Sequence, residues 1–312
     1  MSVKKIFFKQ GGFSFISTLF KRHILFYSFL QFLILPKNKT GLELLRESIN
    51  LKSYLKLKNK LKIKNIKKDE SKINNEKEKI IWFCWLQGVD EAPLLVKRCY
   101  ESIQKFCFDY KINFIDSKNF LQYTNIPDYI ISKWNKGIIS NTHFSDILRI
   151  NLLAEQGGTW IDSTVLLTAK IPQDIENSSL FMFRTYKPGS NGKAVNLSSW
   201  FISANRENKI LKLTQEFLFY YWKKQNYLCD YFLLHNFIQI AFEIYPEEET
   251  LIPKYTNETP HFMLFELSKE FNRQKWTSFC NQSFCHKLTY KLTDKEESKS
   301  GTFYKFILEK KS

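Results

Sequence analysis

Hydrophobic and polar residues follow one another in patterns that predict alternating strands and helices from residue 80 onward. The stretch IIWFCWLQG (80–88) is apolar until a polar residue and a glycine end it, which is typical of a strand buried on both faces and followed by a loop. Residues 92–106 repeat apolar side chains at helical spacing. The stretches DYKINFID (109–116) and TWIDSTVLLT (159–168) predict two further strands.

Two helices are predicted before the third of these strands. The stretch PDYIISKWNKG (127–137) opens with proline, which suits the first turn of a helix, and closes with glycine. The stretch HFSDILRINLLAEQGG (143–158) has Ser145 as its predicted N-cap and ends at the pair Gly157-Gly158. This order of elements predicts an α/β domain with a mostly parallel sheet flanked by helices.

Polar residues follow the three predicted strands. They are Gln87, the segment around Asp116 and Asn119, and the run Asp162-Ser163-Thr164. In α/β sheets of this kind, ligands bind in the crevice beyond the carboxyl ends of the strands. We therefore expect a binding site at this edge.

The helix before the third strand carries a charged pair, Asp146 and Arg149, which project from the same helical face. It leads directly into two glycines, whose freedom to adopt positive φ permits a tight turn, and then to Asp162. A surface ion pair would explain Asp146 and Arg149, and a helix cap would separately explain the two glycines. Their closeness along the chain instead favours one polar pocket formed by the three charged residues.

The positive charge of the chain is concentrated before the predicted domain. Residues 1–80 hold 19 Lys and Arg against 6 Asp and Glu, whereas residues 81–312 hold 28 against 25. A basic segment can bind anionic lipid or nucleic acid, or be solvated. The body has no arginine-rich or recognition-helix pattern, so we expect no nucleic-acid partner. We divide the chain into a basic, largely helical segment (1–78) and the α/β domain (79–312).

Within the basic segment, the apolar stretch ILFYSFLQFLIL (24–35) is too short to span a membrane. Twelve helical residues cover about 18 Å, against a hydrocarbon core of about 30 Å. Two interpretations stay open, a helix buried in the domain and a helix lying on the inner leaflet of the cell membrane. Residues 40–64 are expected to be helical and residues 65–79 to form a solvated linker.

The six cysteines form no CxxC pair and show no zinc spacing with histidine. No small-residue cleavage site follows the apolar stretch, so a signal peptide is not expected. Both observations favour a reducing, cytoplasmic location.

Three stretches resemble the capsular polysaccharide synthesis protein family, IWFCWLQGVDEAPLLVKRCYESI (81–103), SDILRINLLAEQGGTWIDSTV (145–165) and DYFLLHNFI (230–238). This family resembles the glycosyltransferases that extend mannan chains and the glucosylating clostridial toxins. The resemblance implies a GT-A fold, a Rossmann-like nucleotide-sugar-binding architecture with the donor at the carboxyl edge of the sheet.

In the related enzymes the middle block reads GG-x-aromatic-x-Asp-x-Asp, and this pattern implies individual roles. Asp146 and Arg149 become donor-sugar ligands, while Asp162 becomes the first acid, which is catalytic and holds donor and metal. The second acid is replaced by Thr164, a neutral and weaker ligand for a hard cation. Binding of Mn²⁺ or Mg²⁺ by Asp162 and Thr164 is therefore one expectation, and a site without metal is the other.

Glycosyl transfer also places negative charge on the departing nucleoside diphosphate, which a cation must neutralise. The stretch SFCHKLTYKL (283–292) supplies His286, Lys287 and Lys291, and the C-terminal part of the family resembles it. We assign these three residues, together with Gln87, to donor binding. An exposed basic strand or helix is the alternative.

Asp230 and His235 stand five residues apart in an otherwise aromatic segment predicted to be helical. Asp230 as general base would suit an inverting mechanism, whereas the resemblance implies retention. His235 fits a core position equally well.

The sequence thus predicts a glycosyltransferase that moves a sugar from a nucleotide-sugar donor to a growing capsular or other surface polysaccharide or glycolipid. The basic N-terminus would bring it to a lipid-linked acceptor. The alternative is a non-catalytic carbohydrate-binding or assembly subunit, which the replacement at Thr164 favours. The three charged residues Asp146, Arg149 and Asp162 favour the enzyme.

Overall fold

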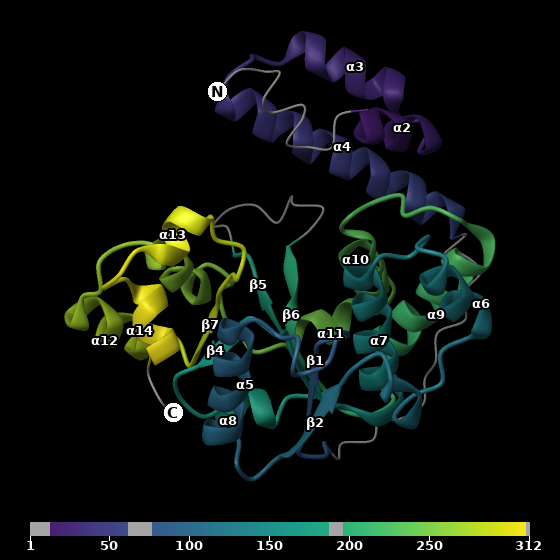
Figure 1. The fold of residues 1–312 in the computed structure, drawn as a ribbon. Helices are drawn as coiled ribbons and strands as arrows, with labels where there is room; N and C mark the ends of the chain where they lie inside the picture. The colour runs from purple at the N-terminus through teal and green to yellow at the C-terminus, as the bar shows by residue number, and fades with distance from the viewer. Residues whose placement is uncertain (1–12, 62–76, 187–195, 310–312) are drawn as a thin grey trace.

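The computed structural model describes residues 13–61, 77–186 and 196–309, and its body is built on a mixed five-stranded sheet (Figure 1). In spatial order the strands are β2 (Lys111–Ile115), β1 (Ile80–Cys84), β3 (Gly158–Ile161), β6 (Leu197–Ala204) and β5 (Leu180–Arg184). Strand β1 runs parallel to β2 and β3, whereas β6 runs antiparallel to β3 and β5. The α/β class is confirmed. The sheet is parallel in one half only, because β6 re-enters it in the opposite direction.

Helices cover both sides of this sheet. Figure 1 shows α7, α9 and α10 grouped together on one side and α5 with α8 on the other. The helices of the body are α5 (Leu94–Phe106), α6 (Asp128–Asn135), α7 (Asn141–Gln156), α8 (Gln173–Glu176), α9 (Lys209–Lys224), α10 (Leu233–Ile244) and α11 (Pro246–Thr250). Almost the whole of α7 is buried, which explains the length of its apolar run.

The predicted start of α7 was wrong by five residues. Its N-cap is Ser140, whose side chain accepts a hydrogen bond from the backbone N–H of His143. Ser145 instead lies within the first turns. Two serines precede the same apolar run, and the chain uses the earlier one, which adds a turn to the helix.

A second, smaller sheet joins the body to the C-terminal region. Strand β4 (Val165–Leu167) pairs antiparallel with β7 (Cys285–Lys287), so that Val165 faces Lys287. The 3₁₀ turns Thr259–His261 and Met263–Glu266 and the helices α12 (Arg273–Gln282), α13 (Asp294–Ser298) and α14 (Phe303–Glu309) complete this region. The pairing brings residues more than 100 positions apart to the same edge.

The N-terminal arm consists of three helices above the body, α2 (Phe13–Lys21), α3 (Leu25–Ile34) and α4 (Lys39–Lys60) (Figure 1). Helix α4 accounts for most of the helix predicted over 40–64. The predicted linker, residues 65–79, lies largely outside the described residues. Arg22 of the arm lies 3.3 Å from Asp230 of the body, and Tyr54 and Lys58 both contact Glu243. In the three described ranges, no helix combines the length and apolar character needed to cross a membrane.

Candidate active site

A cleft of about 450 Å³ lies at the carboxyl ends of β1 and β3, where the sequence predicted a binding site. Residues from five separate parts of the chain line it. Six of the predicted site residues are among them: Gln87, Arg149, Asp162, Thr164, Lys287 and Lys291. A volume of this size is typical of small-molecule sites.

The two glycines before β3 make the turn that aims the next residues at the cleft. Gly157 has φ +69° and ends α7, its N–H bonding to the carbonyl of Leu153 at 3.0 Å. Gly158 has φ +93°, and a Cβ there would lie 2.7 Å from the carbonyl oxygen of Ile80. Both positions therefore require glycine, for positive φ and for close packing of the turn against neighbouring backbone.

Asp162 follows β3 and is held from three directions. Its Oδ1 accepts a hydrogen bond from Trp160 Nε1 at 2.8 Å and lies 3.0 Å from a guanidinium nitrogen of Arg149. Its Oδ2 accepts from Lys287 Nζ at 2.8 Å. The predicted convergence of Arg149 and Asp162 is present, although they lie on different elements. The carboxylate is oriented before any ligand arrives.

Lys287 also binds the residue that replaces the second acid. Its ammonium donates to Thr164 Oγ1 at 2.9 Å while it holds Asp162. The register of β4 against β7 fixes this contact, because Lys287 lies opposite Val165, the residue after Thr164. A cationic nitrogen thus bridges the two side chains that were predicted as metal ligands.

Opposing effects act on the pKa of Asp162. Burial favours the neutral acid, but Arg149 and Lys287 together outweigh this effect and hold the pKa below its usual range. The carboxylate is therefore charged at neutral pH.

Asp146 supports this arrangement from behind and does not line the cleft. Its Oδ1 lies 3.5 Å from Arg149, and its Oδ2 lies 3.3 Å from Nδ1 of His143. Trp222 donates to the other nitrogen of that imidazole at 3.0 Å. Arg149 is further fixed through the carbonyl and hydroxyl oxygens of Ser199. The geometry assigns Asp146 to positioning Arg149, whereas its predicted contact with the donor sugar stays a prediction.

Two predicted site residues lie elsewhere. His286 is buried, its Nε2 lies 3.2 Å from Thr168 Oγ1, and burial lowers its pKa to about 4. It points away from the cleft because neighbouring residues of a strand face opposite sides. The structure thus does not bring it to the donor site.

Asp230 is the second predicted site residue that lies outside the cleft. Its carboxylate pairs with Arg22 and accepts the N–H of Phe232 at 2.9 Å, in a loop before α10 and not on the predicted helix. Burial raises its pKa, partly offset by Arg22. The adjacent Tyr231 lines the cleft instead. His235 lies on α10, and burial lowers its pKa to about 4, so it is neutral.

Aromatic residues that the sequence analysis did not assign to the site also form the cleft. Trp85 and Tyr290 meet edge to face with ring centroids 5.4 Å apart, and both line it. The indole N–H of Trp85 is buried and has no partner among the described residues. Such a donor is available to a ligand. The one signal in the sequence for a role of Trp85 in the site was its position two residues before Gln87, at the end of an apolar run.

The described residues do not fit a divalent metal at this place. They include no group of three or more His, Cys, Asp or Glu side chains able to hold one. The two expected ligands, Asp162 and Thr164, already bind an ammonium, and Asp162 also binds a guanidinium. A dication there would have to displace Lys287 and approach a second cation.

Comparison with known proteins gives a family. Residues 34–307 match the model of the family described as capsular polysaccharide synthesis protein. A search of curated proteins finds no match. Among solved structures, "PaToxG Glycosyltransferase" is 17% identical with a TM-score of 0.37, covering 64% of this chain and 80% of that chain. A structure titled as a transferase mutant is 12% identical with a TM-score of 0.36, covering 62% and 98%.

Proposed function

Because the chain belongs to the capsular polysaccharide synthesis protein family, we propose that it is a glycosyltransferase. It moves a sugar from a nucleotide-sugar donor to a growing capsular or other surface polysaccharide, or to a glycolipid. The observation that carries the proposal is the clamp on Asp162 at the mouth of the cleft, formed by Arg149 and Lys287. Holding a half-buried carboxylate between two cations costs desolvation free energy, and arrangements of this kind cluster at functional sites.

In this proposal the cleft binds the nucleotide sugar with its diphosphate toward Lys287 and Lys291. The bond between the anomeric carbon and the diphosphate oxygen breaks, and the electron pair leaves with the diphosphate. The acceptor hydroxyl oxygen bonds to the anomeric carbon, and its proton passes to an oxygen of the departing diphosphate. The two lysines stabilise the charge that develops on the leaving group. Asp162 and Arg149 orient the sugar.

We further propose that Lys287 supplies the positive charge that a metal gives in the related enzymes. Its ammonium stands between Asp162 and Thr164, where the second acid of a metal site would otherwise be needed. This arrangement explains why a neutral threonine stands at position 164, since a carboxylate there would add negative charge beside the diphosphate. Transfer in this chain accordingly proceeds without a divalent ion.

The cleft offers Asp162 as its one carboxylate among the described lining residues. That carboxylate is fully engaged, and Asp230 does not reach the cleft in this structure. Neither is thus placed as a free general base, which favours the retaining outcome implied by the resemblance over inversion.

The second candidate function is a subunit that binds carbohydrate and has lost turnover. The replacement of an acid by Thr164 favours it. Both functions place a ligand in the same cleft, but only the enzyme releases a nucleoside diphosphate.

Calorimetry with UDP and with GDP tests the donor assignment. Wild type and Asp162→Asn are titrated with Mn²⁺, with Mg²⁺ and with chelator. We expect binding of one nucleotide that persists in chelator and weakens in the variant. Binding that requires metal would refute the role of Lys287. Binding of neither nucleotide would favour the non-catalytic subunit.

A further inference from the structure

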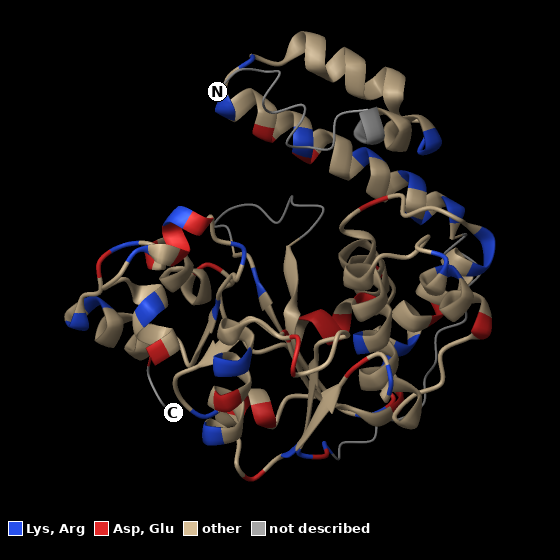
Figure 2. Cartoon of the chain, in the orientation of Figure 1, with Lys and Arg blue, Asp and Glu red and all other residues tan. Residues whose placement is uncertain are grey.

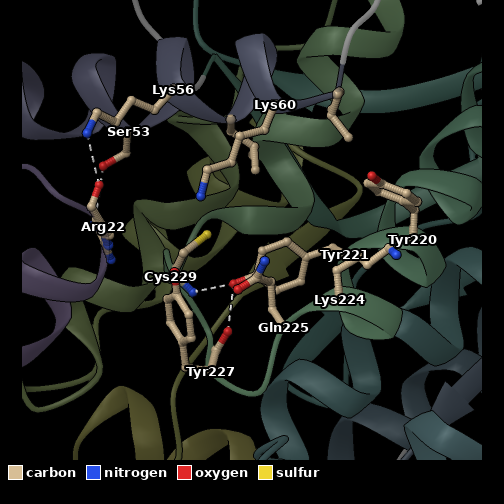
Figure 3. A pocket seen from close by; sticks show the side chains of 12 residues that line it. Arg22, Ser53, Lys56, Lys60, Tyr220, Tyr221, Lys224, Gln225, Tyr227 and Cys229 are labelled. Atoms are coloured by element: carbon tan, nitrogen blue, oxygen red, sulfur yellow. Dashed lines mark hydrogen bonds between the residues drawn. The ribbon is translucent and has the colours of Figure 1, made fainter.

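A second pocket, of about 70 Å³, lies where the N-terminal arm meets the body. We call it the junction pocket. Helix α4 forms one wall, and the end of α9 with the loop after it forms the other (Figure 3). Its lining includes the basic residues Arg22, Lys56, Lys60 and Lys224, together with Tyr220, which is exposed, and Tyr227, which is half-buried. None of the described lining residues is acidic.

The four cations of the junction pocket are not equally neutralised. Arg22 pairs with Asp230 at 3.3 Å, and Lys56 Nζ donates to the carbonyl oxygens of Arg22 and His23 at 3.2 and 2.6 Å. Lys60 and Lys224 form no ion pair with any residue of the described ranges. Figure 3 shows the Lys60 ammonium reaching from α4 toward Cys229. Two ammonium groups without an ion-pair partner among the described residues, in a pocket without acidic lining, give it a positive potential that attracts anions.

The arm that forms this pocket also exposes an apolar face. Helix α3 packs one side on α4, where Tyr27 and Ser48 share a hydrogen bond of 2.6 Å. Its other side is exposed, with Phe26 at 74% and Ile34 at 76% accessibility. Phe29, Leu30 and Leu33 lie between them at helical spacing, all exposed. Figure 2 shows α3 free of charged residues while α4 carries several. An apolar face of this extent beside basic residues is typical of helices that lie in a membrane interface.

One loop connects the junction pocket to the cleft. Tyr227 and Cys229 line the pocket, and Tyr231, two residues further, lines the cleft. Asp230 between them anchors the loop to Arg22 of the arm. The loop that lines the pocket therefore continues directly into the lining of the donor cleft.

We propose that the junction pocket binds a lipid-borne phosphate, with Lys60 and Lys224 as its ligands and α3 seated in the membrane interface. The inference rests on the proposed function in one respect, that the lipid carries the acceptor whose saccharide reaches past Tyr231 into the cleft. A phosphate supplies the negative charge that the pocket lacks, and a lipid supplies the apolar surface that the face of α3 lacks.

Vesicle co-sedimentation with the full chain tests this proposal. The vesicles are phosphatidylcholine alone, phosphatidylcholine with an anionic phospholipid, and phosphatidylcholine with a polyprenyl phosphate. We expect Lys60→Gln/Lys224→Gln to weaken binding to both phosphate-bearing vesicles about 25-fold, from about fivefold per lysine. The matched control Lys111→Gln/Lys295→Gln removes the same charge from exposed positions of the body and should bind nearly as wild type.

A second variant tests the arm. Phe29→Ser/Leu33→Ser should lose binding to every vesicle by about tenfold or more, because its apolar face no longer enters the interface. Wild-type binding by either double variant would overturn the corresponding half of the proposal. Competition by soluble pyrophosphate that equals the polyprenyl vesicles would show a site for free phosphate and overturn the lipid assignment.

Nucleotide calorimetry on the Lys60→Gln/Lys224→Gln variant separates this proposal from the donor site. Unchanged nucleotide affinity is expected, since neither lysine lines the cleft. Loss of nucleotide affinity in this variant would mean that the substitutions disturb the body. Weaker vesicle binding by the same variant would then be a consequence of that disturbance, and it would count against a phosphate site in the pocket.

Discussion

Removing the Lys287 ammonium is the sharpest perturbation of the proposed donor site. Lys287→Ala deletes two hydrogen bonds, of 2.8 Å to Asp162 and 2.9 Å to Thr164. Both side chains of the ion pair are 21% exposed, so solvent only partly screens them. Asp162 keeps Arg149 and Trp160 as partners, and we therefore expect the variant to fold.

The expected magnitude follows from the lost charge. A hydrogen bond to a charged group contributes about 1.5–3 kcal/mol, which corresponds to a roughly 10- to 150-fold weaker nucleoside diphosphate affinity. Turnover should fall further, by about 10²–10³, because the charge on the leaving group is greatest in the transition state. Calorimetry measures the first quantity, and release of nucleoside diphosphate from the donor measures the second.

Two controls give the measurement its meaning. Lys287→Arg keeps the charge and should retain more binding than alanine does. Thr164→Asp/Lys287→Ala restores two acids and removes the competing ammonium, so its binding should become dependent on Mn²⁺. Unchanged affinity in Lys287→Ala, or wild-type binding that is lost in chelator, would refute the reasoning.

The remaining predictions concern the same edge of the sheet. Asp162→Asn should lower donor turnover more than 100-fold, a roughly 10²–10³ effect, with an unchanged circular dichroism spectrum; retained turnover would remove Asp162 from the site. Lys291→Ala should weaken nucleotide binding more than acceptor binding, and titrations showing the reverse would take it away from the diphosphate. Gly158→Ala should lower the free energy of unfolding in urea by more than Gly137→Ala, because both have positive φ but only Gly158 has a carbonyl oxygen 2.7 Å from the new Cβ; equal losses would contradict this. The lowered pKa of Asp162 keeps it charged as pH falls, so affinity for an intact nucleotide sugar should persist down to the ordinary aspartate pKa of about 3.9, and a loss above that pH in wild type that Asp162→Asn does not show would contradict the ion pairs of Asp162 with Arg149 and Lys287.

Local patterns were sufficient for β1, β2 and the turn that precedes Asp162. The stretch 159–168 was wrongly predicted as one strand, because the turn at Asp162 divides it into β3 and β4, which belong to different sheets. The apolar run at 80–84 became β1, and the glycine pair adopts the positive φ values expected of it. Both features depend on residues adjacent in sequence, which periodicity and backbone sterics describe well.

Contacts across long sequence separations were not predictable in the same way. His286 and Lys287 are adjacent, and only the pairing of β7 with β4 decides that Lys287 faces Asp162. The sequence analysis predicted Asp230 as a general base and missed its ion pair with Arg22. Arg22 lies 208 residues away, in an arm whose packing against the body no local sequence pattern predicts. The antiparallel entry of β6 has the same cause, since strand direction depends on the path of the intervening chain.

The central claim is that the cleft holds a nucleotide sugar through Asp162 and transfers its sugar without a metal. The most direct measurement is release of UDP or GDP from a panel of nucleotide sugars in the presence of chelator, with wild type and Asp162→Asn compared side by side. The account predicts release from at least one donor by wild type and at least a roughly hundredfold loss in the variant. Release that appears only with added metal, or that the variant retains, would contradict it.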